Sequence, residues 1–305
     1  MKEYTFETLR NRFTITGDLV ARTALRVGSG RANNVVGNDL PVLRDALGEP
    51  LIPGASLKGL LRAQIETLVR ALHPSQARDL NETEDVMREQ VAGLRDAPEL
   101  VELRRQGEGA KADARYTDNL LQRVCTLMDV TFGAPWLAGR LSISDARVDR
   151  SLWFGQYEVR NGVALNRDTE TAEEGLLYDY EVVPAGTRFS FRLVLENAEP
   201  WQCGMLLLAL QPWTRGEIQI GGFRTRGLGY VALEQAAYRF ISVSSADDVL
   251  RMICDDATLD ALEIAHADVL IDPDPTMEPA RGWYQAFRAV LASGTLPLTT
   301  ENNHA

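Results

Sequence analysis

GNDLPVLRDALGEPLIPGASLKGLLR, residues 37–62, combines a polar loop, a short extended segment, a turn and the start of a helix. Pro53 and Gly54 interrupt regular structure just before Ser56, and serine is a residue type that favours the N-cap position of a helix. The pattern predicts an amphipathic helix that begins near Ser56 and buries one face. Apolar residues recur at helical spacing beyond that point: Leu57, Leu60, Leu61, Ile65, Leu68, Val69 and Leu72.

Two cations lie on the polar side of this expected helix. Lys58 and Arg62 are one turn apart, and Glu66 and Arg70 continue the same i, i+4 row. Because the first backbone N–H groups of a helix lack partners within it, the helix start and its two cations could seat phosphate groups. The alternative is an ordinary amphipathic helix whose polar face is solvated.

Strand-like segments and a second helix suggest how the core is built. In the first segment Phe13, Ile15 and Leu19 share one parity, and the polar residues share the other. Pro200 is placed at the first position of the second helix. The resulting order of strands and helices favours an α+β sandwich, with helices on one face of an antiparallel sheet. The strands are expected over residues 13–27, 141–148, 187–196 and 230–240.

Two segments interrupt this core. Residues 74–118 are charged, and we expect an insertion that is helical over 79–105 and flexible over 107–111. Residues 157–186 are polar and rich in turn signals, which is typical of a loop or hairpin at the surface.

The negative charge of the chain is concentrated towards its end. The formal net charge is −11, and residues 241–305 hold eleven acidic and three basic side chains, so the rest is near neutral and could carry a local basic face. An acidic tail suggests a protein contact or solubility. We treat residues 1–245 as the core and 246–305 as an acidic C-terminal extension, with helices expected over 247–261 and 282–291.

Several protein classes are disfavoured by what the sequence lacks. No run is long and apolar enough to span a bilayer, and the charged N-terminus lacks an apolar signal segment, so a cytoplasmic location is expected. Cys125, Cys203 and Cys254 are far apart and in no ligand spacing, so we expect reduced packing residues. There is no HExxH, paired CxxC, GxSxG or Walker motif, which argues against the hydrolase and nucleotide-hydrolysis classes that use them.

Two motifs resemble those of the RAMP superfamily, the RRM-like proteins of CRISPR systems. The first is LIPGASLKGLLR at residues 51–62, and the second is the glycine-rich IGGFRTRGLGYV at residues 220–231. With GNDLPVLRD at residues 37–45 in front of the first motif, the chain more narrowly resembles the backbone subunit of type III CRISPR effector complexes, which repeats along the guide RNA. The similarity covers residues 10–72 and 140–240.

The resemblance implies a fold class, an activity and partners. The fold would be α+β, with an RRM-like or ferredoxin-like core, an antiparallel sheet, a helical insertion and a thumb-like hairpin within residues 157–186 that lies across the guide–target duplex. The chain would bind guide RNA through its phosphates and cleave the paired target RNA as a metal-dependent endoribonuclease. Its partners would be the CRISPR guide RNA, the target RNA, and other copies of itself or related RAMP subunits, with no membrane.

The resemblance also implies site residues. Asp39 matches the aspartate that the resembling subunits use to cut target RNA, so it is the expected catalytic residue and the ligand of Mg²⁺ or another divalent cation. One carboxylate can suffice because RNA supplies its own nucleophile, the 2′-hydroxyl, and further metal ligands. Asp45, by contrast, has a sequence setting typical of a turn. The expected RNA-binding residues are Ser56, Lys58, Arg62, Arg160, Arg167, Thr169, Arg224 and Arg226.

Other functions stay open at this point. The same fold could hold the guide as a scaffold without cleaving. It could be a guide-processing endoribonuclease, although those usually use a histidine or tyrosine near the N-terminus, and no histidine precedes His73. It could also be a generic ferredoxin-like oligomerisation domain. The hairpin residues could belong to a surface loop, and the two glycine-loop arginines to a surface turn.

Overall fold

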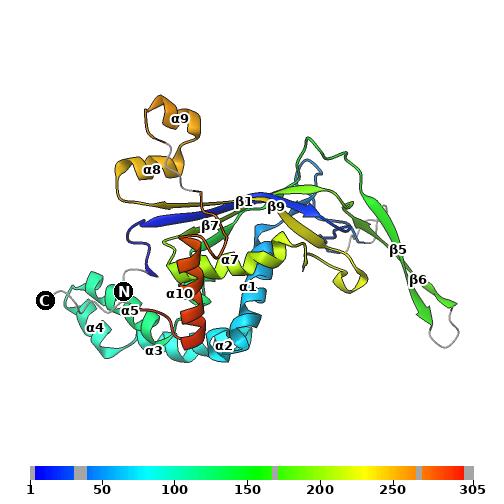
Figure 1. Cartoon of the computed structure of the whole chain (residues 1–305). Helices are drawn as coiled ribbons and strands as arrows, with labels where there is room; N and C mark the ends of the chain where they lie inside the picture. Colours follow the sequence, from blue (N-terminus) through cyan, green and yellow to red (C-terminus); the bar gives the residue numbers. More distant parts are fainter. Residues whose placement is uncertain (1–3, 31–39, 167–170, 266–269, 299–305) are drawn as a thin grey trace.

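The computed structural model describes residues 4–30, 40–166, 171–265 and 270–298, and it centres on one antiparallel sheet (Figure 1). The sheet strands are β1 (Asn11–Ala21), β3 (Leu141–Ile143), β7 (Arg188–Glu196), β8 (Ile218–Gln219) and β9 (Tyr230–Ser242). They stand in the order β3-β7-β1-β9-β8. The first strand of the chain is therefore paired on both sides, with β7 and with β9.

Two helices cover one face of this sheet. α1 (Gly54–Arg70) lies between β1 and β3 in sequence, and α7 (Pro200–Thr214) lies between β7 and β9. Both are below the sheet in Figure 1. The order β-α-β-β-α-β is that of a ferredoxin-like unit, and β8 adds a short edge strand. The predicted α+β fold class is confirmed.

The alternation along β1 builds the core, because successive side chains of a strand point to opposite faces. Phe13, Ile15 and Leu19 are completely buried. One parity of the strand thus faces the helices, as predicted. Buried partners on β7 are Leu195, Leu193 and Phe189, and α1 adds Leu57, Leu61, Ile65 and Val69.

The first strand is shorter than the prediction over residues 13–27. β1 ends at Ala21, where the chain leaves the sheet. Residues 25 and 26 instead form isolated bridges with Val183 and Gly221. The extended segment after β1 therefore joins other parts of the chain, and these contacts position the candidate site.

The strand predicted over residues 141–148 is split in two. β3 ends at Ile143, and β4 (Ala146–Arg147) leaves the sheet to pair with β2 (Leu51–Ile52). The interruption at Asp145 has a structural role, because this residue turns towards the start of α1.

The insertion is a helical arm at one end of the molecule (Figure 1). The helical prediction over residues 79–105 is confirmed, with Asp79 and Glu82 forming a capping box at its start. The flexible piece predicted over 107–111 is wrong, because one turn at Gly107, with φ of 79°, suffices before the next helix begins. The arm contains η2 (Pro74–Gln76), α2 (Leu80–Val86), η3 (Met87–Val91), α3 (Ala92–Arg95), α4 (Pro98–Arg105), α5 (Gly109–Arg123) and α6 (Asp129–Phe132).

A two-stranded hairpin projects from the opposite end of the sheet (Figure 1). Its strands, β5 (Glu158–Asn166) and β6 (Thr171–Val182), pair antiparallel and form a sheet of their own. A hairpin predicted within residues 157–186 is therefore present. At its base, bridges join Tyr180 to Leu40 and Val183 to Leu25 of the core.

The single helix predicted over residues 247–261 is wrong. The chain forms α8 (Ala246–Ile253) and α9 (Asp256–Ala261), because Asp255 caps a new helix by accepting the Thr258 N–H at 2.9 Å. Both helices lie on the opposite face of the sheet from α1 and α7 (Figure 1).

The last helix, α10 (Ala280–Ser293), belongs to the hydrophobic core. Its Trp283 packs on Phe13 and Phe240, with ring centroids 5.3 Å and 5.1 Å apart. The helix predicted over residues 282–291 is confirmed and is longer than expected. The division of the chain at residue 245 stays a prediction.

The cysteines behave as packing residues. Cys125 and Cys203 are buried, Cys254 is half-buried, and all three are free. Burial raises the pKa of the Cys125 thiol to about 12. Across the described ranges, no helix combines the length and the apolar character needed to cross a membrane.

Candidate nucleic-acid interface

The start of α1 differs from the sequence prediction. The helix begins at Gly54, so Pro53 occupies the N-cap position, and the prediction that Ser56 caps the helix is wrong. The reason is the close packing of Gly54 on the backbone of Ile143, where an added Cβ would lie 2.1 Å from the carbonyl oxygen. Asp145 then acts as the cap, accepting the Gly54 N–H at 2.8 Å.

Further N–H groups of this first turn have partners inside the chain. Ser56 and Leu57 donate their backbone N–H groups to the Pro53 carbonyl, at 2.9 Å and 3.2 Å. The Ser56 side chain is on the exposed side of the helix. An incoming phosphate would meet the carboxylate of Asp145 at this helix start, and like charges repel.

Lys58 and Arg62 are used within the fold. The Lys58 ammonium donates to the Leu141 carbonyl at 2.9 Å. Arg62 forms an ion pair with Glu66 at 2.7 Å and donates to the Gly133 carbonyl at 3.3 Å. Burial, and then the neighbouring Arg62, lower the pKa of Lys58. Both cations tie α1 to neighbouring backbone, and their assignment to RNA binding stays a prediction.

The residue expected to be catalytic, Asp39, lies outside the described residues. Both flanks of its loop are described. Gly28 bridges to Val42, the Ser29 N–H donates to Pro41 at 3.3 Å, and Leu40 bridges to Tyr180 at the base of the hairpin. The two ends of the loop are thus held together beside β6.

Glu181 fixes the segment that follows this loop. Its carboxylate accepts the Val42 N–H at 3.2 Å and pairs with Arg44 at 2.7 Å. The Arg44 guanidinium also lies 3.9 Å from the ring centroid of Tyr157. Glu181 is buried, and a buried carboxylate needs hydrogen-bond donors or an opposite charge. The Val42 N–H and the Arg44 guanidinium supply them. The segment from residue 40 to residue 44 is consequently anchored to the hairpin base.

Asp45 has the turn role predicted for it. Its carboxylate accepts the N–H groups of Leu47 and Glu49 at 2.9 Å and 3.0 Å. These hydrogen bonds, that of Glu49 first, lower the pKa of Asp45. One carboxylate oxygen serves this turn, and the other lies 3.9 Å from the Arg147 guanidinium.

The glycine-rich loop packs closely on the segment that follows β1. A Cβ at Gly221 would lie 2.1 Å from the Arg26 carbonyl oxygen, and one at Gly229 would lie 2.2 Å from that of Ile220. Both glycines have positive φ, 82° and 87°. The glycines therefore permit a tight backbone approach, and the loop carries Arg224 and Arg226 outwards as exposed side chains.

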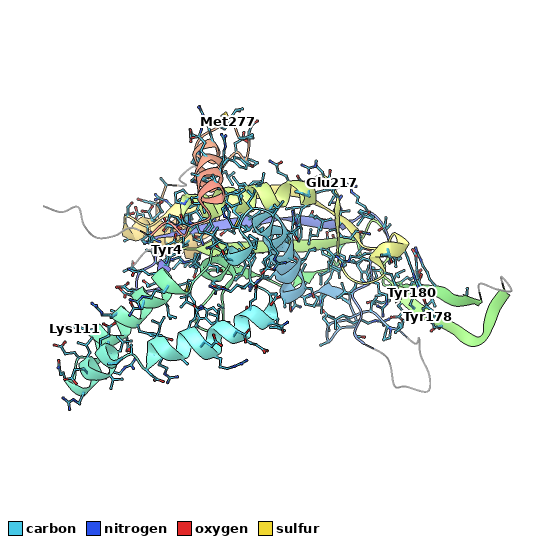
Figure 2. All side chains as sticks on the ribbon, turned by 90° about the horizontal axis from the view of Figure 1, so that it is seen from below. Tyr4, Lys111, Tyr178, Tyr180, Glu217 and Met277 are labelled. Carbon is cyan, nitrogen blue, oxygen red and sulfur yellow. The ribbon has the colours of Figure 1, made fainter. Side chains whose placement is uncertain are left out.

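An arginine–aromatic corner forms where this loop meets the hairpin. We define it as Arg26, Tyr178, Tyr180, Phe223 and Arg226. The guanidinium groups of Arg26 and Arg226 lie 5.1 Å and 4.7 Å from the Phe223 ring centroid, and the Tyr180 ring meets Phe223 edge-on at 4.7 Å. Arg226 donates a hydrogen bond to the Tyr178 hydroxyl. Figure 2 shows both tyrosines where the hairpin joins the core.

This corner contains a hydrogen-bond donor that is not used within the described part of the chain. The Nε of Arg26 is buried with no hydrogen-bond partner in the described part of the chain. Burial lowers the pKa of the Arg26 guanidinium, and it is the largest influence on that pKa. Arg226 is exposed, and its hydrogen bond with Tyr178 raises the pKa of its guanidinium.

The structure brings some predicted RNA-binding residues together and separates others. Arg160 is opposite Tyr180 in the hairpin register, so it shares a face with the corner, and it pairs with Glu158 at 2.9 Å. Arg224 and Arg226 lie on the adjoining loop. Ser56, Lys58 and Arg62 belong to α1, and Arg167 and Thr169 lie outside the described residues.

Three aromatic residues of the corner were missed from the sequence. Tyr178 and Tyr180 have the same parity in β6, and Tyr178 lies over Gly162 of the facing strand. The sequence signal for these tyrosines was the alternation Tyr-Asp-Tyr at residues 178–180, which places both rings on one face of the strand. Tyr178 is paired with Gly162 of the facing strand. Phe223 lies inside the glycine motif, from which only Arg224 and Arg226 were assigned a role.

A metal centre is not formed by the described residues. None of their His, Cys, Asp and Glu side chains gather in a group of three or more that could hold an ion. Glu181, next to the corner, is engaged by Val42 and Arg44. The described side chains therefore do not fit a metal cage made of protein alone.

Fold and site together define a class. This is a ferredoxin-like α+β protein with a helical arm, a projecting hairpin and a glycine loop that presents arginines at the hairpin base. The model of the RAMP superfamily matches residues 18–232, and the chain belongs to this superfamily.

Two similar proteins carry the name CRISPR system Cms endoribonuclease Csm3. The one from Methanocaldococcus jannaschii is 40% identical over 60 residues, and the one from Methanothermobacter thermautotrophicus is 36% identical over 59 residues. Each match covers 19% of this chain and 24% of the relative. The chain thus matches about a quarter of the length of these relatives.

Proposed function

We propose that this chain is a backbone subunit of a type III CRISPR ribonucleoprotein, which binds guide RNA through its phosphates and cleaves the paired target RNA. Membership of the RAMP superfamily and the similarity to two proteins named Csm3 endoribonucleases support this assignment. The observation that carries it is the meeting of three elements: the two ends of the loop of Asp39, the hairpin base and the glycine loop.

The guide would be held at the arginine–aromatic corner and the exposed arginines beside it. Arg224 and Arg226 can contact phosphate oxygens, and the glycines let the backbone come close to the RNA strand. Such contacts read no base, which suits a subunit whose sequence specificity comes from guide–target pairing. Arg160, Arg167 and Thr169 of the hairpin would contact the duplex. Ser56, Lys58 and Arg62 are the remaining proposed contacts, and their internal hydrogen bonds suggest a lesser contribution.

Cleavage would depend on Asp39 and on the geometry that the corner imposes on the RNA. The nucleophile is the 2′-hydroxyl of the target, so the protein must hold one nucleotide in an in-line arrangement. Aromatic faces such as those of Tyr178 and Tyr180 can support a base that leaves its stack. A divalent cation such as Mg²⁺, held by Asp39 and RNA oxygens, would neutralise charge on the scissile phosphate.

Replacing Asp39 tests the catalytic part of this proposal. In a complex reconstituted with guide RNA, Asp39→Ala should reduce cleavage of labelled target RNA by about a thousandfold or more and leave guide binding unchanged. Asp45→Asn is the matched control, because this second aspartate of the same stretch serves a turn, and cleavage should persist. If the Asp39→Ala complex cuts at the same positions and rate, the catalytic assignment is wrong.

A non-catalytic scaffold is the second candidate. The carboxylate of Asp45 is engaged in its own turn, and that of Glu181 by Val42 and Arg44, so no substitute for Asp39 is available from these two. A wild-type complex that binds target RNA but does not cut it with Mg²⁺ or Mn²⁺ would support the scaffold. A guide-processing role is less well supported, since His73 is engaged by the Leu291 carbonyl at 2.8 Å.

A further inference from the structure

One buried carboxylate joins the hairpin base to the extended segment 40–44. Glu181 of β6 is 8% exposed, and one of its oxygens accepts the Val42 N–H at 3.2 Å and an Arg44 N–H at 2.7 Å. Its own backbone N–H donates to the Leu40 carbonyl at 3.1 Å. The side chain and the backbone of Glu181 therefore both bind this segment.

The Arg44 side chain is held from two sides. Glu181 pairs with its guanidinium, which also lies 3.9 Å from the ring centroid of Tyr157. The Tyr157 hydroxyl in turn donates to the Gly48 carbonyl at 2.8 Å. The ion pair is thus fixed between β6 and the residue just before β5.

Strand β6 carries the arginine–aromatic corner and this ion pair on opposite sides. Tyr180 and Glu181 are consecutive, and successive side chains of a strand point to opposite faces. The Tyr180 ring packs on Phe223 in the corner, whereas Glu181 binds Val42. Since a strand rises only about 3.3 Å per residue, one strand sets a short and fixed distance between the corner and the segment 40–44.

Stability alone is a weak reason for a charged pair at this place. Replacing a buried ion pair by apolar residues of similar volume is often neutral or stabilising, because buried charges lose their hydration. Such a pair does restrict direction and distance, since charge-assisted hydrogen bonds are short and depend on geometry. The pair of Glu181 and Arg44 therefore contributes more to the placement of the segment than to the strength of the fold.

We propose that Glu181 is a positioning residue for cleavage of the target RNA. It fixes the segment 40–44, which directly follows Asp39, relative to the corner that holds the RNA. The inference rests on the proposed function and deepens it, because Glu181 acts through the backbone of its neighbours and not by contact with the RNA. In-line attack is sensitive to position, and a displacement of about 1 Å can cost about a hundredfold in rate.

Single-turnover cleavage by the reconstituted complex tests this role. With the complex in excess and at saturating concentration, Glu181→Ala should cut labelled target RNA at least about tenfold more slowly than wild type. Its Kd for target RNA should stay within about twofold, because a positioning residue changes the rate and not the affinity. Glu181→Gln keeps an oxygen for the Val42 N–H and loses only the charge that Arg44 requires, so its rate should fall between the two. It also carries the test if the alanine variant does not fold.

A double variant tests whether Glu181 and Arg44 act through one contact. Arg44→Ala should also slow cleavage. Residues that act through a shared contact have non-additive effects, so Glu181→Ala with Arg44→Ala should cut about as slowly as the slower single variant. Losses that multiply in the double variant would contradict the shared role.

Glu49→Gln is the matched control. Glu49 lies in the turn next to the segment and pairs with an arginine too, Arg150, at 2.9 Å. The change removes the same charge as Glu181→Gln from a neighbouring place, and the cleavage rate should match that of wild type.

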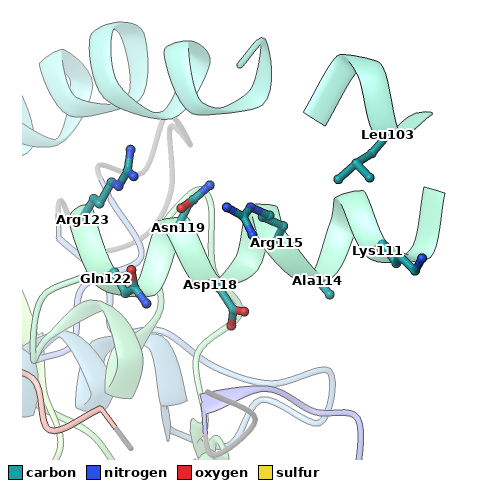
Figure 3. A pocket seen from close by; sticks show the side chains of 8 residues that line it. All are labelled: Leu103, Lys111, Ala114, Arg115, Asp118, Asn119, Gln122 and Arg123. Atoms are coloured by element: carbon teal, nitrogen blue, oxygen red, sulfur yellow. The ribbon is translucent and has the colours of Figure 1, made fainter. Parts of the chain in front are cut away.

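A distant control lies in the helical arm, at the other end of the sheet from the hairpin (Figure 1). A pocket of about 550 Å³ along α5 is lined there by side chains of both charges, among them Lys111, Arg115 and Asp118 (Figure 3). Asp118→Asn removes one negative charge from this pocket and should leave cleavage unchanged.

Hydrogen exchange of the isolated full-length chain gives a readout that needs no RNA. Without its carboxylate acceptor, the Val42 amide should exchange at least about tenfold faster in Glu181→Ala than in wild type or Glu49→Gln. A wild-type exchange rate would overturn the inference. A wild-type cleavage rate in Glu181→Ala, or a loss of rate matched by an equal loss of target affinity, would do so too.

Failure of the proposed function has a different signature. If the wild-type complex does not cut target RNA, or if Asp39→Ala still cuts it, the proposed function is wrong and this inference is wrong with it. If wild type cuts, Asp39→Ala does not, and Glu181→Ala cuts like wild type, only the inference about Glu181 is wrong.

Discussion

Two parts of the molecule hold cations that the sequence assigns to RNA, and they use them differently. At the start of α1, Lys58 and Arg62 donate to backbone carbonyls of the chain itself. At the arginine–aromatic corner, Arg226 lies on the ring of Phe223, and Arg224 beside it is exposed. A ring supports a cation without using its N–H donors, so the corner keeps most of its donors for a ligand.

The comparison teaches that a motif does not reveal which of its charges are available. Both motifs combine glycine with basic residues, and both glycine sets allow a close backbone approach. The difference comes from the surroundings. α1 lies beside carbonyls of Leu141 in β3 and of Gly133 after α6, and these accept hydrogen bonds from its two cations. The glycine loop instead lies at the edge of the molecule beside the hairpin (Figure 1).

The largest effect is expected where the backbone of α1 touches its neighbour. Gly54→Ala should lower the free energy of unfolding by about 3 kcal/mol, because the new methyl group would lie 2.1 Å from the Ile143 carbonyl oxygen. Gly59→Ala is the matched control in the same helix. It meets nothing within 4 Å and should raise stability by about 0.5–1 kcal/mol.

Urea unfolding of the two alanine variants measures this difference. Equal stabilities for Gly54→Ala and Gly59→Ala would mean that the start of α1 is looser than the structure indicates. In that case the helix start would have room for a phosphate, and the contrast with the corner would weaken.

The next effect concerns RNA affinity. Arg224→Ala with Arg226→Ala should weaken binding of guide RNA by at least about tenfold, because charged hydrogen bonds to phosphate are lost. The slope of affinity against salt should fall by about 1 for each cation removed. Lys58→Ala with Arg62→Ala should instead lower stability and change affinity less. Fluorescence anisotropy at several salt concentrations, with urea unfolding in parallel, separates the two effects.

A control for net charge sharpens this test. Arg104→Ala with Arg105→Ala removes two arginines from the helical arm, far from the corner (Figure 1). If this pair weakens RNA binding as much as the glycine-loop pair does, binding depends on overall charge and not on the corner.

The smallest effect is a pH dependence at Lys58. Burial lowers its pKa in the folded protein, so the unfolded chain holds the proton more tightly. Stability then rises with pH as it passes through the folded pKa towards the ordinary value of 10.5, where the penalty for the buried charge has disappeared. Relative to Lys58→Met, wild type should gain stability between neutral pH and pH 10.5. A constant difference across this range would contradict the burial of Lys58.

Local patterns were good guides to the elements of the core. The parity of Phe13, Ile15 and Leu19 indicated the buried face of β1, and Pro200 marked the start of α7. Element ends were less certain, because they depend on contacts that are distant in sequence. The chain leaves the sheet after Ala21, and its next residues, Leu25 and Arg26, pair with Val183 and Gly221. Both partners are far from residues 25 and 26 in the sequence.

The candidate site shows the same limit. Arg224 and Arg226 could be proposed from their motif, but Tyr178 and Tyr180 could not, since their meeting with Phe223 depends on how the hairpin joins the core. Ser56 illustrates the reverse case. A good capping residue lost that role because Asp145, about ninety positions away, already binds the helix start.

The sequence by itself determined the fold class, the superfamily resemblance and the residue types available for binding RNA, because these follow from side-chain periodicity and from short motifs. The tertiary structure alone decided which of these cations are available to a ligand and which are engaged within the fold. The hydrogen bonds and the burial of a side chain depend on the neighbours that folding places around it. Those neighbours are distant in the sequence, so the residue type alone does not reveal them.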